Sequence, residues 1–113
     1  MAYTIKTIPQ FDKEFKNLSK KYLSLKDDLK ELLEELKINP KAGSHLGENV
    51  YKTRMAVTSK GRGKSGGARI ITFLKIENEC IYLLSIYDKA ERNTITDNEI
   101  KQLLKNISEN NNN

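Results

Sequence analysis

The sequence predicts an α/β (α+β) domain with one short strand, two helices, three strands and a final helix, in that order. Two patterns of apolar residues support this fold class. In three segments apolar residues recur three and four positions apart, which gives a helix one buried face. Residues 50–87 contain three stretches rich in β-branched and aromatic residues, as is typical of strands. The chain is long enough to bury one core, so a single domain is expected over residues 1–109.

The N-terminal third is expected to form a strand and a helical hairpin. Residues 3–8 alternate and are β-branched, and a proline ends this strand. A helix is expected from residue 9 or 10 to residue 22, and Ser24 can cap a second helix that ends at Asn39-Pro40. The apolar stripes are Phe11, Phe15, Leu18 and Tyr22, then Leu25, Leu29, Leu32, Leu33 and Leu36. Because the link is short, an antiparallel hairpin is predicted.

Three consecutive strands are expected at residues 50–57, 69–76 and 80–87. Asn78 lies in a tight turn between the second and the third. Strands joined by a turn are usually antiparallel neighbours, so this pairing is predicted here. The segment before them, residues 41–48, is expected to be a polar loop.

The C-terminal segment is expected to be a helix followed by a short tail. Residues 96–99, Thr-Asp-Asn-Glu, match a capping box, in which a threonine and a glutamate satisfy each other's backbone amides. The apolar positions that follow are Ile100, Leu103, Leu104 and Ile107. Residues 110–113 are all asparagine, and a tail of such low complexity is expected to be disordered.

Positive charge is concentrated in the middle of the chain. The net charge is +5 and the isoelectric point is about 9.3. Residues 49–76 contain seven basic residues and no acid. That segment alone carries +7, so the remainder sums to −2. Such an asymmetry predicts a basic patch on one part of the surface, rather than charge that serves only general solubility.

Several classes of protein and site are disfavoured. The single cysteine, Cys80, allows no internal disulfide and suits a reducing cytosol; we expect it to fill the core. One histidine and one cysteine cannot build a structural zinc site, and His45 is expected to lie on a surface loop. No window approaches 18 consecutive apolar residues, and the N-terminus lacks the apolar core of a signal peptide. We therefore expect a soluble, cytoplasmic protein with no metal, cofactor or membrane contact.

The densest basic segment is residues 59–69, which we call the glycine-rich loop. It alternates glycine with Lys60, Arg62 and Lys64, ends at Arg69, and contains no acid. A loop this rich in glycine is not expected to hold itself rigid against like-charge repulsion. Its natural counterion is a polyanion such as a nucleic-acid backbone. The alternative is a flexible hairpin loop whose lysines serve solubility. A nucleotide-binding P-loop is rejected, because the spacing between the glycines is wrong.

Further cations are expected on the neighbouring strands. Lys52 and Arg54 share one strand face, and Arg69 would lie near Arg54 if the next strand pairs through the loop. Tyr87 and Lys89 end the last strand. The alternative is a solvent face that is basic by chance, but like charges on neighbouring strands repel each other, which favours a functional cluster.

Such a set could cleave RNA without a metal, because RNA carries its own nucleophile, the 2′-hydroxyl. Arginine offers planar bidentate donors to phosphate. A lysine among other cations has a depressed pKa and can accept a proton. Tyr87 can stack on a base or donate a proton. These features fit RNA cleavage and simple RNA binding equally.

Three segments, residues 50–56, 59–71 and 82–89, together resemble the RelE/ParE toxin superfamily and are most similar to its HigB-type branch, toxins of type II toxin–antitoxin modules. The specific part of the resemblance covers about residues 49–105. It implies a RelE-like fold, with helices packed on a small, curved, mainly antiparallel sheet. It also implies ribosome-dependent cleavage of mRNA, without a metal and with a 2′,3′-cyclic phosphate product.

The resemblance also assigns residues and partners. Arg54 and Arg69 match strand arginines of the family's basic site, and Lys89 matches a basic position after the last strand. The expected catalytic set is Arg54, Lys60, Lys64, Arg69, Tyr87 and Lys89, with Lys52 and Arg62 binding RNA. The expected partners are the ribosome, mRNA and a cognate antitoxin, of the helix-turn-helix, HigA-like kind.

The chain departs from the family downstream of the last strand. Some members place a catalytic tyrosine or histidine there, where this chain has Asn93, Thr94 and Ile95; Tyr87 is a substitute, and the general base is not identified. Two alternatives stay open: a ParE-like inhibitor of gyrase and a non-catalytic RNA-binding module.

Overall fold

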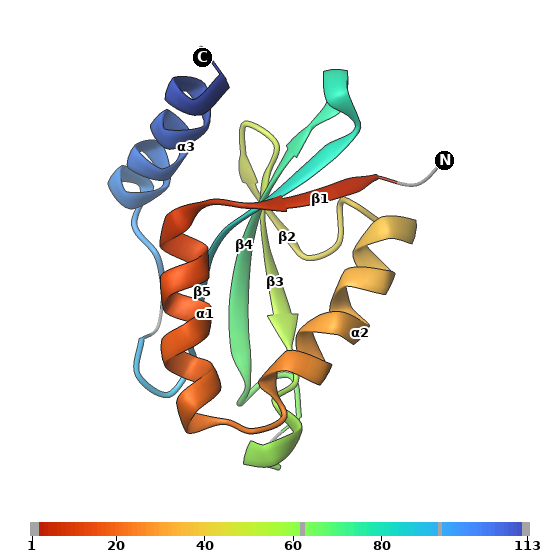
Figure 1. Ribbon diagram of the computed structural model, residues 1–113, viewed down its shortest axis with the longest axis vertical. Coiled ribbons are helices and arrows are strands. Elements are labelled where there is room, and N and C mark those ends of the chain that lie inside the picture. The colour runs from red at the N-terminus through yellow and green to blue at the C-terminus, as the bar shows by residue number, and fades with distance from the viewer. Residues whose placement is uncertain (1–2, 62, 93, 112–113) are drawn as a thin grey trace.

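The computed structural model describes residues 3–61, 63–92 and 94–111. The described residues form three helices and one sheet, which confirms the predicted α/β class. The helices lie around the curved sheet (Figure 1). The elements are β1 (Thr4–Thr7), α1 (Pro9–Lys21), α2 (Leu25–Ile38), β2 (Ser44–Gly47), β3 (Val50–Met55), β4 (Ala68–Lys75), β5 (Cys80–Asp88) and α3 (Asp97–Asn111). Short 3-10 turns, η1 (Thr58–Lys60) and η2 (Ile76–Asn78), follow β3 and β4.

The sheet has the order β1-β5-β4-β3-β2. The three predicted neighbours, β3, β4 and β5, pair antiparallel as expected, and β1 pairs parallel with β5. One strand was missed: β2 lies within residues 41–48, which were predicted to be a polar loop. It pairs only with β3, through a register shift, and three of its four residues are exposed. An exposed edge strand has no buried face, so the sequence shows no apolar alternation there.

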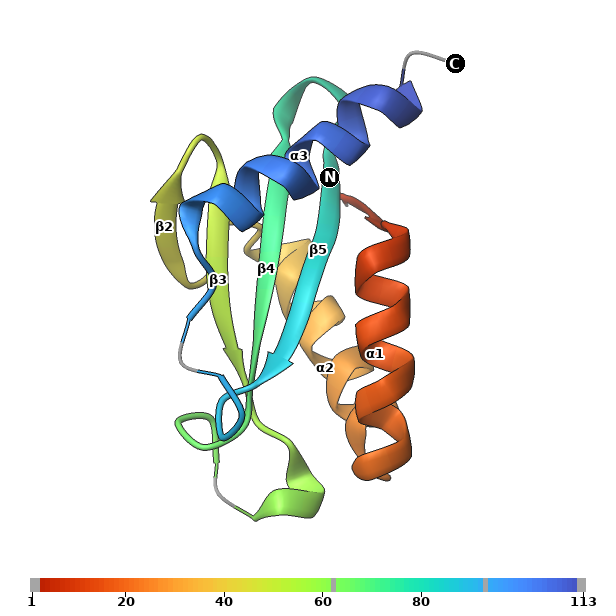
Figure 2. The ribbon, with the colours of Figure 1, turned by 90° about the vertical axis from the view of Figure 1, so that its left-hand side faces the viewer.

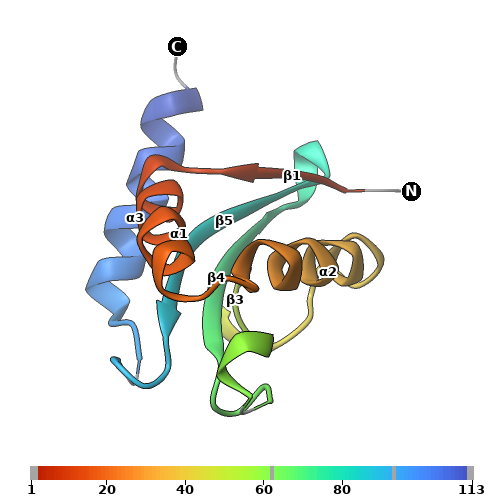
Figure 3. The same cartoon turned by 60° about the horizontal axis from the view of Figure 1, so that its bottom comes forward.

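The helices lie on different sides of the sheet. The sheet curls around α2, and α3 crosses the opposite face (Figures 2 and 3). Helix α1 packs against β5, and α2 contacts β1, β3 and η1. The predicted hairpin is therefore splayed: α1 and α2 share a short link and then diverge (Figure 1). Their apolar stripes pack on the sheet rather than mainly on each other.

The core is centred on β4 and β5. All nine residues of β5 are buried, and Ile70, Ile71, Ile81 and Leu84 have no exposed surface. From the helices, Phe11, Leu25 and Leu36 join this cluster, and Cys80 fills the core as expected. Burying both faces of the central strands fixes the register that aligns the basic residues described below.

The helix ends follow the sequence in one case and depart from it in another. The capping box at α3 is confirmed: the Glu99 amide donates to Thr96 Oγ1 at 3.2 Å and the Thr96 amide donates to Glu99 Oε1 at 3.1 Å. Ser24 precedes α2 but makes no side-chain cap, because its hydroxyl donates to the carboxylate of Asp28 instead. Helix α3 continues to Asn111, so two residues of the predicted disordered tail are helical, and 112–113 lie outside the described residues.

Candidate functional site

A cavity of about 540 Å³ lies over the end of β3 that leads into the glycine-rich loop. Its basic lining consists of Lys52, Arg54, Lys64, Arg69 and Lys89, and we call this set the basic pocket. The remaining walls are Glu35 of α2, the segment Ala42–Ser44 and Thr53. The pocket therefore gathers five of the eight residues that the sequence assigned to the site.

Strand register explains why these cations meet. Arg54 of β3 lies directly opposite Arg69 of β4, as predicted, and Arg69 lies opposite Tyr87 of β5. Residues directly opposite each other in an antiparallel pair project on the same side. Lys52 lies two residues before Arg54 and shares its face. The Lys89 amide donates to the carbonyl of Gly67 at 3.1 Å, which joins the turn after β5 to the loop.

Two glycines allow the backbone to close around the pocket. A Cβ on Gly67 would lie 2.1 Å from the Met55 carbonyl oxygen, and a Cβ on Gly43 would lie 2.3 Å from the Lys52 carbonyl oxygen. Gly43 also has a φ of +99°, a conformation that favours glycine. No side chain fits at either position without moving backbone, so these glycines fix the approach of the pocket walls to β3.

Arg69 supports the loop as well as lining the pocket. Only 6% of the residue is exposed. Its Nη1 donates to the carbonyls of Lys64 at 3.0 Å and Ala68 at 3.2 Å, and its Nη2 donates to the carbonyl of Ser65 at 3.2 Å. The guanidinium thus holds the second half of the glycine-rich loop in place, a role that the sequence analysis did not assign to it.

Lys60 lies outside the basic pocket. Its Nζ donates to Asp88 Oδ1 at 2.6 Å and lies 5.4 Å from the centre of the Tyr22 ring, and its side chain is only 8% exposed. Asp88 also accepts hydrogen bonds from the Tyr22 hydroxyl at 2.5 Å and from the Ala90 amide at 2.9 Å. Burial raises the pKa of Asp88, but the bonds from Lys60, Tyr22 and Ala90 outweigh it and hold the pKa at about 2. The structure thus places Lys60 in a buried ion pair.

A second buried acid anchors the start of the loop. Asp28 of α2 accepts hydrogen bonds from the Thr58 amide at 2.9 Å and the Thr58 hydroxyl at 2.6 Å. The Ser59 amide donates to Ser24 Oγ at 2.8 Å. The loop was not expected to hold itself rigid, and acids from other elements hold it instead. Local sequence did not show this, because Asp28 and Asp88 are distant in the chain.

Tyr87 also lies outside the basic pocket, although its backbone is in register with Arg69. It lines a separate hollow with Glu14 and Arg92, and the Arg92 guanidinium lies 5.5 Å from its ring centre. Its buried hydroxyl has no hydrogen-bond partner among the described residues. Burial raises the pKa of Tyr87, against the opposing charges of Arg69 and Arg92, so the phenol is neutral at pH 7.

The structure describes some of the remaining residues that the sequence analysis named. Arg62 and Asn93 lie outside the described residues. Ile95 is buried, and its side chain has no group that transfers a proton. His45, expected on a surface loop, is an exposed residue of β2 and stacks on Tyr51 with ring centres 4.9 Å apart. Glu35 lines the pocket but was not singled out from the sequence, since only the curl of the sheet brings α2 over β3.

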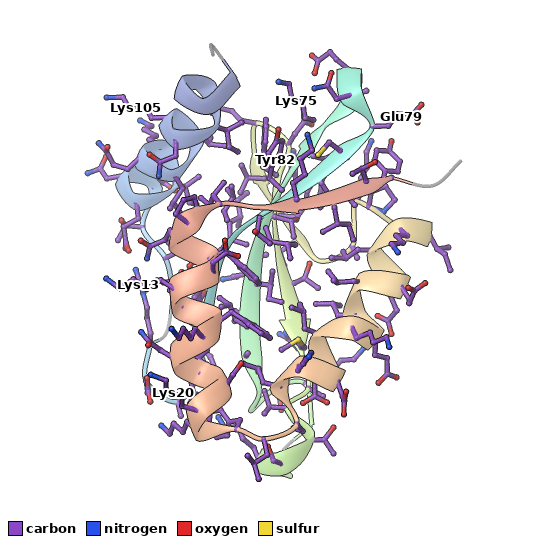
Figure 4. All side chains as sticks on the ribbon, viewed as in Figure 1. Lys13, Lys20, Lys75, Glu79, Tyr82 and Lys105 are labelled. Carbon is purple, nitrogen blue, oxygen red and sulfur yellow. The ribbon has the colours of Figure 1, made fainter. Side chains whose placement is uncertain are left out.

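The pocket differs from the rest of the surface in its charge density. Lys13 and Lys20 project from α1 and Lys105 from α3 (Figure 4), and none of these three lysines lines the cavity. Among the described residues, no group of three or more His, Cys, Asp or Glu side chains is placed to hold a metal ion. The part of the chain that the structure describes also contains no helix long and apolar enough to cross a membrane. Five cations around one cavity suit an anionic ligand with more than one charge.

Comparison with known proteins gives one family and one fold. The family model described as "RelE toxin of RelE / RelB toxin-antitoxin system" matches residues 10–112. A double arginine-to-alanine mutant of the Escherichia coli toxin RelE in the free state has a similar structure, with a TM-score of 0.63 and 19% identity over 95% of this chain and 99% of that one.

Two solved complexes have the same fold. The toxin–antitoxin complex RelBE from Escherichia coli matches with a TM-score of 0.60 and 19% identity, over 77% of this chain and 96% of the matched chain. The complex RelBE2 from Mycobacterium tuberculosis matches with a TM-score of 0.59 and 14% identity, over 80% and 94%.

Proposed function

The chain belongs to the family of RelE toxins of toxin–antitoxin systems, and from this premise we propose that it cleaves mRNA on the ribosome. The observation that supports cleavage of a nucleic acid is the basic pocket, where five cations from β3, β4, the glycine-rich loop and the turn after β5 surround one cavity. Within the family we propose that it is of the HigB type and acts in the cytoplasm, where ribosomes are found.

The pocket suits a reaction in which the RNA supplies the nucleophile. The 2′-hydroxyl loses a proton and attacks the adjacent phosphorus, and the 5′ oxygen leaves with a proton. The products are a 2′,3′-cyclic phosphate and a 5′-hydroxyl, and this reaction does not require a metal. Arg54 is exposed and lines the cavity, so it can donate two parallel hydrogen bonds to the phosphorane. Lys52 and Lys64 add charge, and Arg69 keeps the loop in position.

The regulatory partner follows from the family. The solved relatives include toxins bound to antitoxins. We propose that this chain binds a cognate antitoxin of the helix-turn-helix, HigA-like kind, encoded beside its gene. A pocket that cleaves mRNA would harm the cell that makes it unless a partner inhibits it. The partner can cover the pocket with acidic side chains or block entry to the ribosome.

The test is induction of the chain in cells, with and without the neighbouring reading frame, followed by mapping of mRNA 5′ ends. We expect new ends within coding regions that disappear when the antitoxin is co-expressed. Intact mRNA together with loss of DNA supercoiling would instead identify a gyrase inhibitor. Harmless expression of a chain that binds RNA would identify an RNA-binding module.

A further inference from the structure

We propose that Glu35 of α2 is the general base that accepts the 2′ proton; this inference rests on the proposed cleavage of mRNA. A general base must accept that proton. The five side chains that define the basic pocket are lysines and arginines, so none of them is an anion. Among the described residues that line the cavity, Glu35 is the only acid. It faces the same cavity as the cations that would hold the scissile phosphate.

The fold brings Glu35 to the pocket from a separate layer. The sheet curls around α2, and this helix contacts β3 (Figure 3). Leu32 and Leu36 anchor the helix by burial, which leaves Glu35 between them on the side that faces Arg54. Within the described part of the chain its carboxylate makes no hydrogen bond and no ion pair, so both oxygens are available to a substrate.

The charged groups around Glu35 support this role. From β3 it faces Lys52 and Arg54, from the glycine-rich loop Lys64, from β4 Arg69, and from the turn after β5 Lys89. On its own helix the nearest acid along this face is Glu31, one turn earlier, which lines an adjoining hollow with Arg54 and Lys64 but not the basic pocket. Glu35 is therefore the one described acid that lines the cavity together with these five cations.

The other described titratable groups of this region are less suited. Asp28 and Asp88 are buried and already accept two or more hydrogen bonds each. Tyr87 lines a different hollow, and its phenol is protonated at pH 7. The reaction also needs a proton donor for the leaving 5′ oxygen, and we assign that role to a pocket lysine, which leaves Glu35 as the acceptor.

The proposed step balances as follows. The 2′-hydroxyl gives its proton to a Glu35 carboxylate oxygen while the 2′ oxygen bonds to phosphorus. The bond from phosphorus to the 5′ oxygen breaks, and that oxygen takes a proton from a pocket ammonium group. Glu35 then returns its proton to solvent, and the ammonium recovers one from solvent. The guanidinium of Arg54 stabilises the charge on phosphorus in between.

The test is single-turnover cleavage of mRNA on programmed ribosomes by the full chain and its variants. Removing a general base typically lowers the rate by about 100-fold or more. We expect Glu35→Gln to lose that much while binding the ribosome complex as tightly as the wild type or more tightly, because one negative charge is removed. A structural role would not give a rate loss with retained affinity. Glu35→Asp should recover at least about tenfold of the lost rate, since it keeps a carboxylate.

Glu31→Gln is the matched control, one helical turn away on the same helix, and it should cleave at the wild-type rate. If the wild type cleaves and Glu35→Gln cleaves within about threefold of it, the assignment of Glu35 is wrong and the proposed function stands. The assignment is also wrong if Glu35→Asp is no faster than Glu35→Gln, because the loss would then come from shape. If the wild type itself does not cleave, the proposed function fails.

Discussion

The two ends of the glycine-rich loop carry similar lysines with opposite surroundings. Lys60, near the start, is buried against Asp88 and the Tyr22 ring, and the residues before it are tied to Asp28 and Ser24. Lys64, four residues later, is exposed and lines the basic pocket. Local sequence does not distinguish these lysines. The difference comes from the buried acids Asp28 and Asp88, which accept hydrogen bonds from Thr58 and Lys60 at the start of the loop.

The comparison separates stability from function within one loop. At the anchored end, a cation neutralises a buried carboxylate and fixes the course of the chain. At the open end, cations are concentrated with a single carboxylate, and no buried acid pairs with Lys64 among the described residues. The anchored end therefore positions the open end, and substitutions at the two should have different consequences.

The largest expected effect is on stability at the anchored end. Asp88→Ala leaves the Lys60 ammonium buried without its partner, and breaking a buried pair costs about 3–5 kcal/mol. Urea unfolding of the purified chain measures this loss. The control is the double variant Asp88→Ala, Lys60→Met, which removes both charges and should recover the part of the stability that the unpaired ammonium costs, while the Tyr22 hydroxyl and the Ala90 amide still lack their acceptor. A single variant as stable as the wild type would show that the pair does not anchor the loop.

Arg69→Ala should have an intermediate effect on both stability and activity. Three backbone carbonyls lose their donor, which costs about 1–3 kcal/mol, and the pocket loses a cation. Thermal unfolding and cleavage on ribosomes should both report the change. Arg54→Ala is the matched comparison, because this exposed residue should affect cleavage alone. Full stability in Arg69→Ala would contradict the loop-supporting role.

Acidification should weaken the anchored end specifically. The folded-state pKa of Asp88 is about 2, below its ordinary value of 3.8, so the carboxylate stabilises the fold above about pH 4. This contribution, of roughly 2 kcal/mol, is lost as the pH falls through the folded-state value. Urea unfolding at pH 7 and pH 3 should show a larger decrease for the wild type than for Asp88→Asn. Equal decreases would rule out this linkage.

The smallest effect on stability is expected at the open end. Lys64→Ala should change the free energy of unfolding by less than about 0.5 kcal/mol, as is usual for an exposed residue. It should instead lower the slope of log affinity for RNA against log salt by about one, the signature of one lost phosphate contact. Lys60→Ala should instead lower the free energy of unfolding, because it leaves Asp88 buried without its partner, and should leave the salt slope unchanged. Identical salt slopes for Lys64→Ala and the wild type would remove Lys64 from the binding surface.

Much of the fold could be predicted because its signals are local. The stripes of α1 and α2, the alternation of β3 and the capping box at Thr96 are each read from adjacent residues. The predicted pairing of β3 with β4 also places Arg54 beside Arg69, as the structure has it. The edge strand β2 escaped prediction because an exposed strand needs no apolar face.

The roles within the site depend on contacts between distant residues. The pairing of Lys60 with Asp88 joins residues 28 positions apart, and the approach of Glu35 to Arg54 depends on the curl of the sheet. Charge density along the sequence identified the cations, but it could not show which of them pair with a buried acid and which line the cavity. Lys60 is engaged by a buried acid and Arg69 by backbone carbonyls, and neither contact is visible in the local sequence.

Cleavage by Arg54→Ala on mRNA-programmed ribosomes tests the central claim most directly. This claim is that the basic pocket holds the scissile phosphate. The control is Lys13→Ala, which removes an exposed lysine of α1 away from the pocket (Figure 4). Loss of a bidentate contact to the phosphate should lower the single-turnover rate by about 100-fold or more, with unfolding unchanged, while the control cleaves normally. Cleavage by Arg54→Ala at the wild-type rate would contradict the account.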